Sequence, residues 1–504
     1  MTGSVVLADV SGNAEADICE GATLMDGLPV MPCFNRYRTH THYMRQCEPI
    51  VLYAEIPPPA VAKLNVGKSY TAPQSHCAVA LRNLWRTTPV SRDEQADAAM
   101  VGAMTKRRIL FFAEAVTLAH VARPIALAAT LDPERYVSFL ACDARYSRFM
   151  ASDTTQALPL HSISSAQFLK SLARGSPVYD LATLRDYLRE DLALIDRIQP
   201  DLIVGDFRLS LSVGARLAGV PYAAVTNAYW SPHYRHRSFP MPVLPMTRVV
   251  PVALARSLFQ MAQPLAFPLH CRPLNRLRTE NGLASFGSDL RKIYTDADHR
   301  LYADDPDMFP LDGLPATDCH LGPVLWSPPM SVPDAWKAID ASRPTVYLTL
   351  GSSGSVDTAR KVLEAVADAG MNLIVASAGA SLPSLRHPRI FVSDFVPGNA
   401  AVALSQLVIC NGGSPTSQQA LAAGVPVLGI AGNMDQFLNM EGVVRAGAGC
   451  VLRADRIDHA ALAGRVEAML ADAPMREAAR SIGQRIRGKP LNAAFGGFLD
   501  GLPR

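Results

Sequence analysis

The chain has 504 residues, which is more than one small module needs, so two or three domains are expected. Hydrophobic residues make up 49% and charged residues 18% of the sequence, a composition that supports large cores and excludes a mainly disordered chain. The formal net charge is +3, and because Lys and Arg are dispersed, no nucleic-acid partner is indicated. The nine cysteines show no disulfide spacing, which is typical of a reducing compartment, so a cytoplasmic location is expected.

Residues 1–104 show little helix or strand periodicity, and we expect an N-terminal extension that catalysis does not need. It is interpreted either as a misassigned upstream start or as a loosely attached segment. Its metal-capable residues Cys33, His40, His42 and Cys47 lack the paired spacing of a zinc site, so no metal is expected. No run of about 18 uninterrupted apolar residues occurs in the chain, so no transmembrane segment is predicted.

Strand and helix patterns alternate between residues 105 and 326. Short apolar runs, typical of buried parallel strands, occur at 109–112, 136–140, 202–204 and 222–225. Helical patterns occur at about 119–131, 181–198 and 208–218. Apolar, Pro-containing residues 231–275 interrupt the alternation and are expected to form helical insertions and loops around a cleft. The order of elements predicts a doubly wound α/β domain.

A Pro-rich stretch at 327–344 reads as a linker, after which the alternation restarts and predicts a second α/β domain at 345–487. Strands are predicted at 346–350, 373–375, 407–409 and 425–428, and helices at 357–369, 415–423, 436–446, 458–471 and 475–486. The tail at 488–504 is expected to cross back to the first domain. The predicted fold class is therefore α/β, with two parallel sheets facing each other across a cleft.

Two Gly-rich turns follow strands of the second domain, at 350–354 and 410–416. Glycines at the carboxyl end of a parallel strand let the backbone approach a phosphate, and the N-terminus of the next helix attracts its charge. In the second turn, Ser414 is expected to be the N-cap and Pro415 the first helical residue. An ordinary turn of a parallel sheet is the alternative. The chain lacks G-x-x-x-x-G-K-[ST], and no G-x-G-x-x-G follows its first strand, which argues against P-loop hydrolases and nicotinamide sites.

Several short motifs follow one another in an order that is more informative than any one of them. They are Leu118-Ala119-His120, Val204-Gly205-Asp206, Gly322-Pro323-Val324, Leu350-Gly351-Ser352, Phe395-Val396-Pro397, Asn411 to Leu428, and Asn433-Met434-Asp435-Gln436 with Asn439. Together they resemble the family 1, UDP-glycosyltransferase-like glycosyltransferases of the GT-B fold, of the bacterial natural-product type. The resemblance covers residues 108–487 but not the first hundred residues.

The resemblance implies a general base with a partner. His120 would take the proton from the acceptor hydroxyl, and Asp206 would hold the imidazole and stabilise its cation. Chemistry supports these roles, because a hydroxyl is a poor nucleophile until its proton can leave and because His titrates near neutral pH. A satisfied structural histidine is the alternative, but the pairing with a strand-end carboxylate favours the catalytic role.

The resemblance also implies a donor site for a UDP- or dTDP-sugar. Phe395, where many relatives have Trp, would stack on the uracil or thymine of the donor. The Val396 backbone would hydrogen-bond the edge of that nucleobase. The Gly-rich turns would bind the diphosphate, and Asp435 and Gln436 the sugar hydroxyls, although Asp435 is alternatively only an N-cap. The donor residues implied in this way are Gly351, Ser352, Phe395, Val396, Asn411, Gly413, Ser414, Thr416, Asp435 and Gln436.

Two features depart from the simplest pattern. Asn411 stands where relatives usually have a His that bonds the diphosphate, and an amide can donate hydrogen bonds but cannot carry positive charge. Asp305-Pro306-Asp307 resembles the Asp-x-Asp motif of metal-dependent glycosyltransferases. Because it lies outside the donor domain, it is interpreted as a solvated turn.

The sequence therefore predicts a metal-independent, inverting glycosyltransferase that needs no cofactor besides its nucleotide-sugar substrate. The expected acceptor is a small lipophilic molecule with a hydroxyl group. One alternative is a glycolipid glycosyltransferase at a membrane surface, which peripheral membrane contact would allow. Another is a non-catalytic protein that binds sugar nucleotides or a partner, which Asn411 and the N-terminal extension suggest. The presence of both His120 and Asp206 argues against this last alternative.

Overall fold

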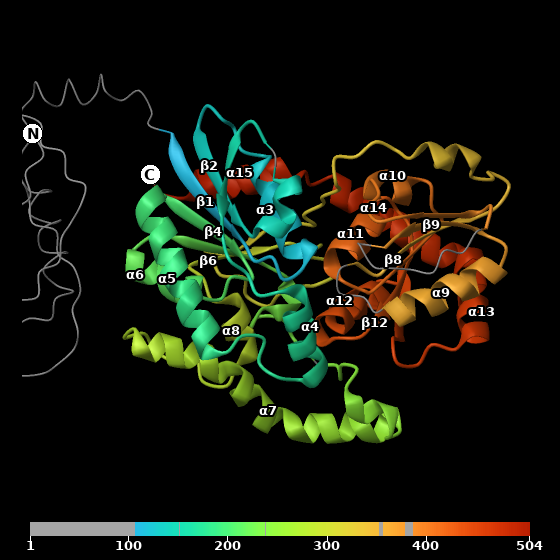
Figure 1. Cartoon of the computed structure of the whole chain (residues 1–504), viewed down its shortest axis with the longest axis horizontal. Coiled ribbons are helices and arrows are strands. Elements are labelled where there is room, and N and C mark those ends of the chain that lie inside the picture. The colour runs from blue at the N-terminus through green and yellow to red at the C-terminus, as the bar shows by residue number, and fades with distance from the viewer. Residues whose placement is uncertain (1–105, 151, 237, 352–355, 378–386, 504) are drawn as a thin grey trace, which may run out of the picture. The chain divides into compact units, whose positions relative to one another are not determined.

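The computed structural model describes residues 106–150, 152–236, 238–351, 356–377 and 387–503 (Figure 1). All of them fall within one compact unit of the chain, Ser91–Arg504. The predicted N-terminal extension, with its metal-capable residues, lies outside the described residues, and so does the predicted donor residue Ser352. In the part of the chain that is described, no helix combines the length and the apolar character needed to cross a membrane.

The first domain is built on a sheet of seven parallel strands in the order β3-β2-β1-β4-β5-β6-β7. Because β1 and β4 are neighbours, Ala113 at the end of one strand lies beside Asp206 at the end of the other. The strands are β1 (Arg107–Ala113), β2 (Tyr136–Cys142), β3 (Thr155–Pro159), β4 (Leu202–Asp206), β5 (Tyr222–Thr226), β6 (His299–Tyr302) and β7 (Cys319–His320).

Both faces of this sheet are covered, which explains why its central strands are apolar throughout. In β1, Ile109 and Phe111 belong to the core shared with α3 (Leu118–Ala128) and α15 (Leu491–Gly501). Leu110 and Phe112 point the other way, into the core with α5 (Leu181–Ile198) and α6 (Leu211–Ala218). The C-terminal helix α15 therefore packs on the first domain, and Arg107 donates to the Pro503 carbonyl oxygen at 3.3 Å.

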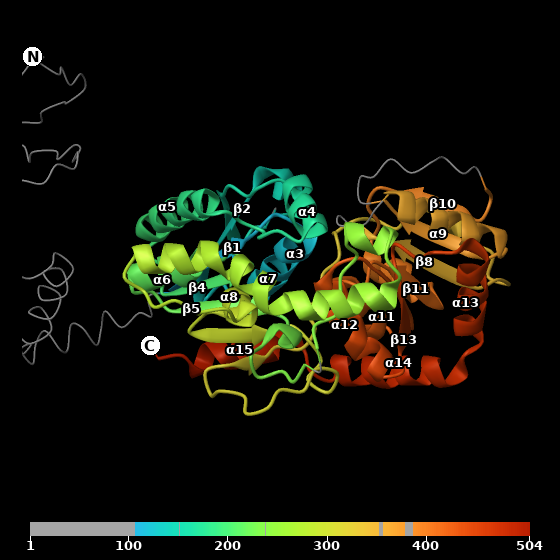
Figure 2. The ribbon, with the colours of Figure 1, turned by 90° about the horizontal axis from the view of Figure 1, so that it is seen from below.

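The second domain has a sheet of six parallel strands in the order β10-β9-β8-β11-β12-β13. One face packs on α9 (Val356–Asp368) and α13 (His459–Ala471), and the other on α11 (Ser414–Ala422), α12 (Met434–Arg445) and α14 (Ala473–Arg487) (Figures 1 and 2). The strands are β8 (Thr345–Thr349), β9 (Asn372–Ala376), β10 (Ile390–Ser393), β11 (Leu407–Cys410), β12 (Val427–Ala431) and β13 (Gly449–Arg453).

The two domains share a buried core. Tyr229 and Phe309 of the first domain are 0% exposed and pack in one cluster with Met440 and Val443 of α12. The contact is so close that a Cβ added at Gly442 would lie 2.3 Å from the Phe309 ring. A side chain at Gly442 would therefore force the two domains apart.

The sequence missed several elements. Five strands were not predicted, namely β3, β6, β7, β10 and β13, together with α4 (Ser165–Arg174), α8 (Leu290–Thr295) and α10 (Gly398–Ala403). The predicted insertions at 231–275 contain one long helix, α7 (Val252–Glu280), which continues through Pro264, Pro268 and Pro273.

Candidate active site

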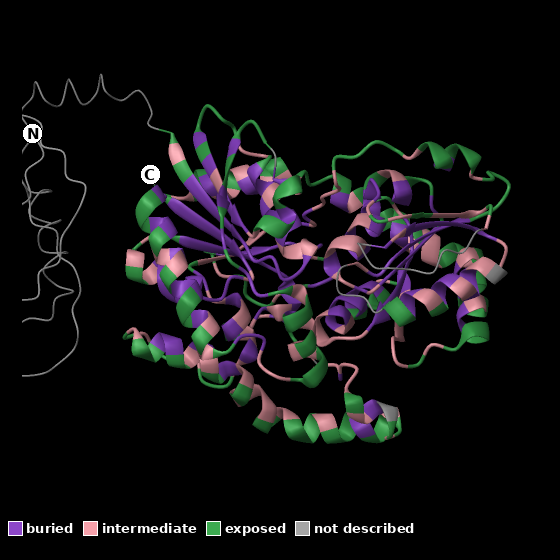
Figure 3. Cartoon of the chain, viewed as in Figure 1, coloured by how far each residue is buried: buried purple, intermediate pink, exposed green. Residues whose placement is uncertain are grey.

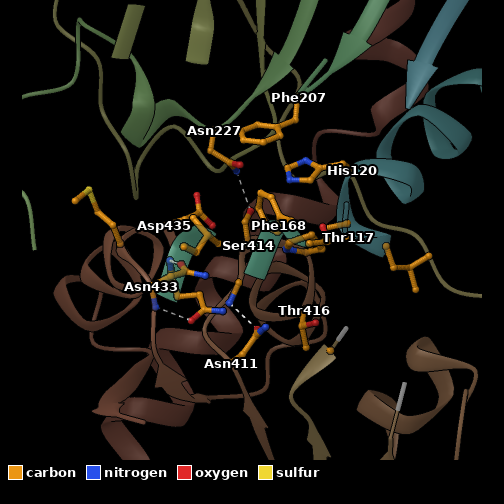
Figure 4. A pocket seen from close by; sticks show the side chains of 18 of the residues that line it. Thr117, His120, Phe168, Phe207, Asn227, Asn411, Ser414, Thr416, Asn433 and Asp435 are labelled. Atoms are coloured by element: carbon orange, nitrogen blue, oxygen red, sulfur yellow. Dashed lines mark hydrogen bonds between the residues drawn. The ribbon is translucent and has the colours of Figure 1, made fainter. Parts of the chain in front are cut away.

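A cavity of about 660 Å³ lies between the domains, at the carboxyl ends of both sheets. Its first-domain wall is mainly apolar, and its second-domain wall is mainly polar. The apolar wall includes Phe168, Leu172, Val178, Phe207, Trp230, Leu258, Phe259, Phe267, Leu290 and Tyr294. The polar wall includes Thr349, Asn411, Ser414, Thr416, Gln419, Asn433, Asp435 and Gln436 (Figure 4).

The predicted base and its partner come together at the junction of the two walls. His120 lies in the first turn of α3, and Asp206 ends the neighbouring strand β4. The His120 Nδ1 atom is 2.8 Å from the Asp206 carboxylate, which is 0% exposed, and the imidazole lines the cavity. With Nδ1 donating to Asp206, the lone pair of the neutral imidazole is on Nε2, the arrangement a general base needs.

A second basic residue, Arg123, binds the same carboxylate. Its Nε donates to one Asp206 oxygen at 2.7 Å, and its Nη2 donates to the other at 2.8 Å. The same Nη2 lies 3.2 Å from His120 Nδ1. Burial alone would lower the pKa of Arg123, but the charge of Asp206 and its hydrogen bonds outweigh burial and raise it. Arg123 was not predicted from the sequence, although it is one helical turn after His120 on α3.

Hydrogen bonds continue from Arg123 to the second domain. Arg123 Nη1 donates to Asn227 Oδ1 at 3.0 Å, and Asn227 Nδ2 donates both to Asp304 at 2.8 Å and to Ser414 Oγ at 2.9 Å. Figure 4 shows the bond between Asn227 and Ser414 spanning the space between the walls. A continuous polar chain thus joins the His120–Asp206 pair to the first residue of α11.

Phe207 packs against one face of the His120 imidazole. Its ring stacks on His120, with centroids 4.7 Å apart and an angle of 13° between the planes. Its φ of 59° is in the left-handed region, which is unfavourable for a bulky residue and is seen where the surroundings fix it. Next to it, buried Arg208 forms ion pairs with Glu114 at 3.0 Å and Asp191 at 2.9 Å, which anchor this loop.

The turn between β11 and α11 forms part of the polar wall. Gly412 has a φ of 79°, and a Cβ there would lie 2.8 Å from Met440 Cγ, so only glycine fits. Asn411 Oδ1 accepts the Gly413 N–H at 3.0 Å. The N-cap is Gly413 and not Ser414 as predicted, because the Ser414 hydroxyl accepts a hydrogen bond from Asn227 of the other domain instead of capping its own helix.

The predicted sugar-binding residues begin α12. The N-cap is Asn433, which forms a capping box with Gln436, so the alternative that Asp435 is an N-cap is wrong. Asp435 accepts the Trp230 indole N–H at 2.8 Å, which is another contact between the domains. Gln436 lines the cavity, but its Oε1 accepts from the backbone of Gly432 at 2.8 Å. Because Oε1 is already bonded, a ligand could be bound only by the Nε2 amino group of Gln436.

The residues predicted to bind the nucleobase of the donor lie at another part of the cavity. Phe395 and Val396 both line it, as does Gly351, whose φ of 60° suits glycine. The Arg148 guanidinium lies 4.3 Å from the centroid of the Phe395 ring, and the Phe149 ring meets it edge-on at 5.6 Å. Two residues of the first domain therefore contact the Phe395 ring of the second domain.

Asp305 is not the solvated residue that the sequence predicted. It is 4% exposed, and its carboxylate accepts from Arg485 of α14 at 2.8 Å. Asp307 pairs with the same guanidinium at 2.9 Å. The Asp-x-Asp motif therefore fastens the second domain to the first.

One polar group in the cavity wall has no partner among the described residues. The Thr117 hydroxyl is buried and forms no hydrogen bond there, and Thr117 lines the cavity just before α3. An unsatisfied buried hydroxyl is costly, so this group is a candidate to bind substrate. No sequence pattern points to Thr117 except its place in the loop before His120.

Comparison with known proteins decides the family. Residues 360–495 match the family described as erythromycin biosynthesis protein CIII-like, C-terminal domain. The chain is 47% identical to a PGL/p-HBAD biosynthesis rhamnosyltransferase of Mycobacterium bovis (strain BCG / Pasteur 1173P2) over 436 residues, which is 85% of this chain and 95% of that protein. The chain belongs to the family 1 glycosyltransferases. A PGL/p-HBAD biosynthesis glycosyltransferase of Mycobacterium tuberculosis (strain ATCC 25177 / H37Ra) is 46% identical over 408 residues, covering 81% of this chain and 93% of that protein.

Solved structures of glycosyltransferases share the fold. The spinosyn rhamnosyltransferase SpnG superposes with a TM-score of 0.56 at 19% identity, covering 78% of this chain and all of that one. The calicheamicin glycosyltransferase CalG4 gives a TM-score of 0.57 at 18% identity, covering 80% of this chain and all of that one. The protein is thus a glycosyltransferase with the GT-B fold, as the motif order predicted.

Proposed function

We propose that this glycosyltransferase moves a deoxyhexose, of which rhamnose is the first candidate, from a UDP- or dTDP-sugar to a hydroxyl of a lipophilic acceptor, with inversion. The His120–Asp206 pair carries the proposal, because it lies between an apolar wall that suits such an acceptor and a polar wall that ends in a helix N-terminus. Rhamnose is preferred because the relative at 47% identity is named a rhamnosyltransferase. The solved relatives SpnG and VinC are described with a spinosyn aglycone and with dTDP, respectively.

In this proposal, His120 Nε2 takes the proton of the acceptor hydroxyl as the oxygen attacks the anomeric carbon. The bond from that carbon to the diphosphate breaks, and the nucleoside diphosphate leaves with the electron pair toward the N-terminus of α11. The N–H groups and the dipole of this helix stabilise the developing negative charge. A single displacement inverts the anomeric centre. Asp206 stabilises the imidazolium, and a proton leaves it in the next step.

The first prediction tests this assignment. Removing a general base typically costs about 10²–10⁴ in rate, so His120→Ala should lose transfer by that factor. Its affinity for dTDP or UDP should change little, because the residues proposed to bind them belong to the other domain. Turnover with dTDP-rhamnose and a phenolic acceptor measures the rate, and calorimetric titration with each nucleotide measures the affinity. NMR of the product anomer tests the inversion.

His161 provides a matched control, because it lies in the same domain but is exposed and does not line the cavity. His161→Ala should transfer sugar at the wild-type rate. Near wild-type turnover in His120→Ala would refute the proposed base. A product with retained configuration would refute the single displacement.

A further inference from the structure

The outer face of α7 carries an apolar stripe that no described element covers. Leu254, Leu258, Met261, Leu265 and Leu269 recur every three or four residues, which places them along one side of the helix. Met261 is 76% exposed and Leu265 is 77% exposed. Figure 3 shows exposed residues along the part of the helix that stands out from the lower edge of the molecule. Contiguous apolar surface of this kind marks an interaction site.

The stripe is continuous with the apolar wall of the cavity. Phe259, Ala262, Ala266 and Phe267, on the other side of the same helix, line the cavity. Leu258 belongs to both surfaces, since it is 43% exposed and also lines the cavity. The same helix therefore carries both the stripe and part of the wall of the proposed acceptor site.

The segment of the chain that contains the stripe is rich in arginine. Residues 207–279 contain nine Arg and no Asp, Glu or Lys. On α7, Arg256 and Arg272 are exposed, and neither forms an ion pair with a described residue, while Arg276 pairs with Glu280 at 3.0 Å. Exposed leucines flanked by arginines are typical of helices that lie in the interface of an anionic membrane. A symmetric contact between two copies of α7 would instead bring arginines face to face.

We propose that the outer face of α7 docks on a lipid surface with anionic headgroups, with the leucine stripe in the interface and the acceptor side of the cavity behind it. The helix lies on the surface and does not cross it, as expected of an amphipathic helix whose other side packs on protein. The proposal rests on the proposed function only in taking the acceptor to be lipophilic. It explains why the stripe adjoins the apolar wall and not the polar one.

The second prediction tests the docking directly. The full chain should sediment with vesicles of phosphatidylcholine and phosphatidylglycerol, and much less with phosphatidylcholine alone. The double variant Met261→Gln, Leu265→Gln should partition onto the mixed vesicles at least tenfold more weakly, because two largely exposed apolar side chains lose their burial in the interface. The control pair Leu217→Gln, Leu404→Gln, at 46% and 43% exposure on other surfaces, should bind like the wild type.

Turnover of a water-soluble phenolic acceptor separates this proposal from the proposed function. Neither Met261 nor Leu265 lines the cavity, so the double variant should keep its turnover of that acceptor. The variant His120→Ala should bind the mixed vesicles even if it is inactive. Vesicle binding therefore tests the docking, and turnover tests the catalytic assignment separately. Equal binding to both vesicle types, no binding to either, or wild-type binding by the double variant would overturn the docking. Self-association that the double variant abolishes, without vesicle binding, would assign the stripe to a second copy.

Discussion

At the scale of single residues, the site is organised around one buried carboxylate that is bound by two basic side chains. Asp206 accepts from His120 and, through both oxygens, from Arg123. The Arg123 guanidinium balances the charge of this buried carboxylate and binds both of its oxygens. Asp206 is thus held in place beside the imidazole. We therefore regard Arg123 as a positioning residue for the proposed base.

The third prediction concerns this balance. In Arg123→Met the nearby positive charge is lost, so the acidic limb of the rate–pH profile should move to higher pH. Breaking a buried ion pair should also cost about 3–5 kcal/mol of stability. Arg123→Lys restores the charge without the two-pronged geometry, so it should return the acidic limb but not the full turnover. Profiles of kcat/KM against pH, with melting curves for each variant, measure these effects.

A merely structural Arg123 would give a different result. In that case both variants would lower the melting temperature, and the acidic limb would stay where the wild type has it. The measurement therefore distinguishes packing from electrostatic positioning.

Sequence reasoning at this scale paired His120 with Asp206, which the structure places in contact, but it missed their local partners. Asp206 ends β4 and His120 follows β1 in the chain, so the adjacency of the two strands brings these residues together. The N-cap predicted at Ser414 was wrong, and so was the alternative that Asp435 is an N-cap. Each of these side chains is bound instead by a residue of the other domain, Asn227 and Trp230 respectively. Contacts separated by about two hundred residues leave no local pattern in the sequence.

At the scale of elements, burial decides which strands the sequence reveals. The central strands β4, β5 and β8 are buried along their whole length and therefore read as continuous apolar runs. The edge strand β10 is only partly buried and β7 has two residues, so neither shows a clear period. In α7 the prolines argue against a helix, yet the helix continues and changes direction along its length (Figure 1), as prolines tend to cause.

The fourth prediction concerns the turn between β11 and α11. Asn411→Ala removes the acceptor of the Gly413 N–H, and, if Asn411 also contacts the diphosphate, should weaken UDP or dTDP binding by about 1–3 kcal/mol. Asn411→Asp keeps the acceptor for Gly413 but adds a negative charge, so it should preserve the fold and weaken nucleotide binding further. Asn411→His, which restores the usual residue of the family, should be tolerated and should raise turnover. Calorimetric titration and kinetics measure each change.

The aspartate variant is the decisive one of the three. If it binds nucleotide as tightly as the wild type, Asn411 does not contact the diphosphate. Its role would then be confined to shaping the turn.

At the scale of the whole molecule, the two walls of the cavity are held together by contacts among the described residues. They include the shared core around Phe309, the ion pairs of Arg485, the bond from Asn227 to Ser414, and the return of α15 to the first domain. Each of these contacts joins segments far apart in the chain. Both described sheets and the described cavity lining are built from segments between residues 106 and 503.

The fifth prediction follows from this organisation and concerns residues 1–103. A chain that begins at Met104 contains every described core and every described residue that lines the cavity. We expect it to keep the melting temperature of the full chain and to transfer sugar at a similar rate. Calorimetry and kinetics on both chains test this, and limited proteolysis of the full chain should first yield a fragment that begins near residue 104.

The competing result has a concrete basis. The rhamnosyltransferase of Mycobacterium bovis matches 85% of the chain, so its match includes some residues before Thr105. If those residues contribute to the acceptor site or cover an apolar surface, the shortened chain should aggregate or show a large change in acceptor KM. A change in KM with an unchanged melting temperature would assign the segment to acceptor binding, whereas a loss of both would assign it to the fold. Either outcome would refute the expectation that residues 1–103 are dispensable.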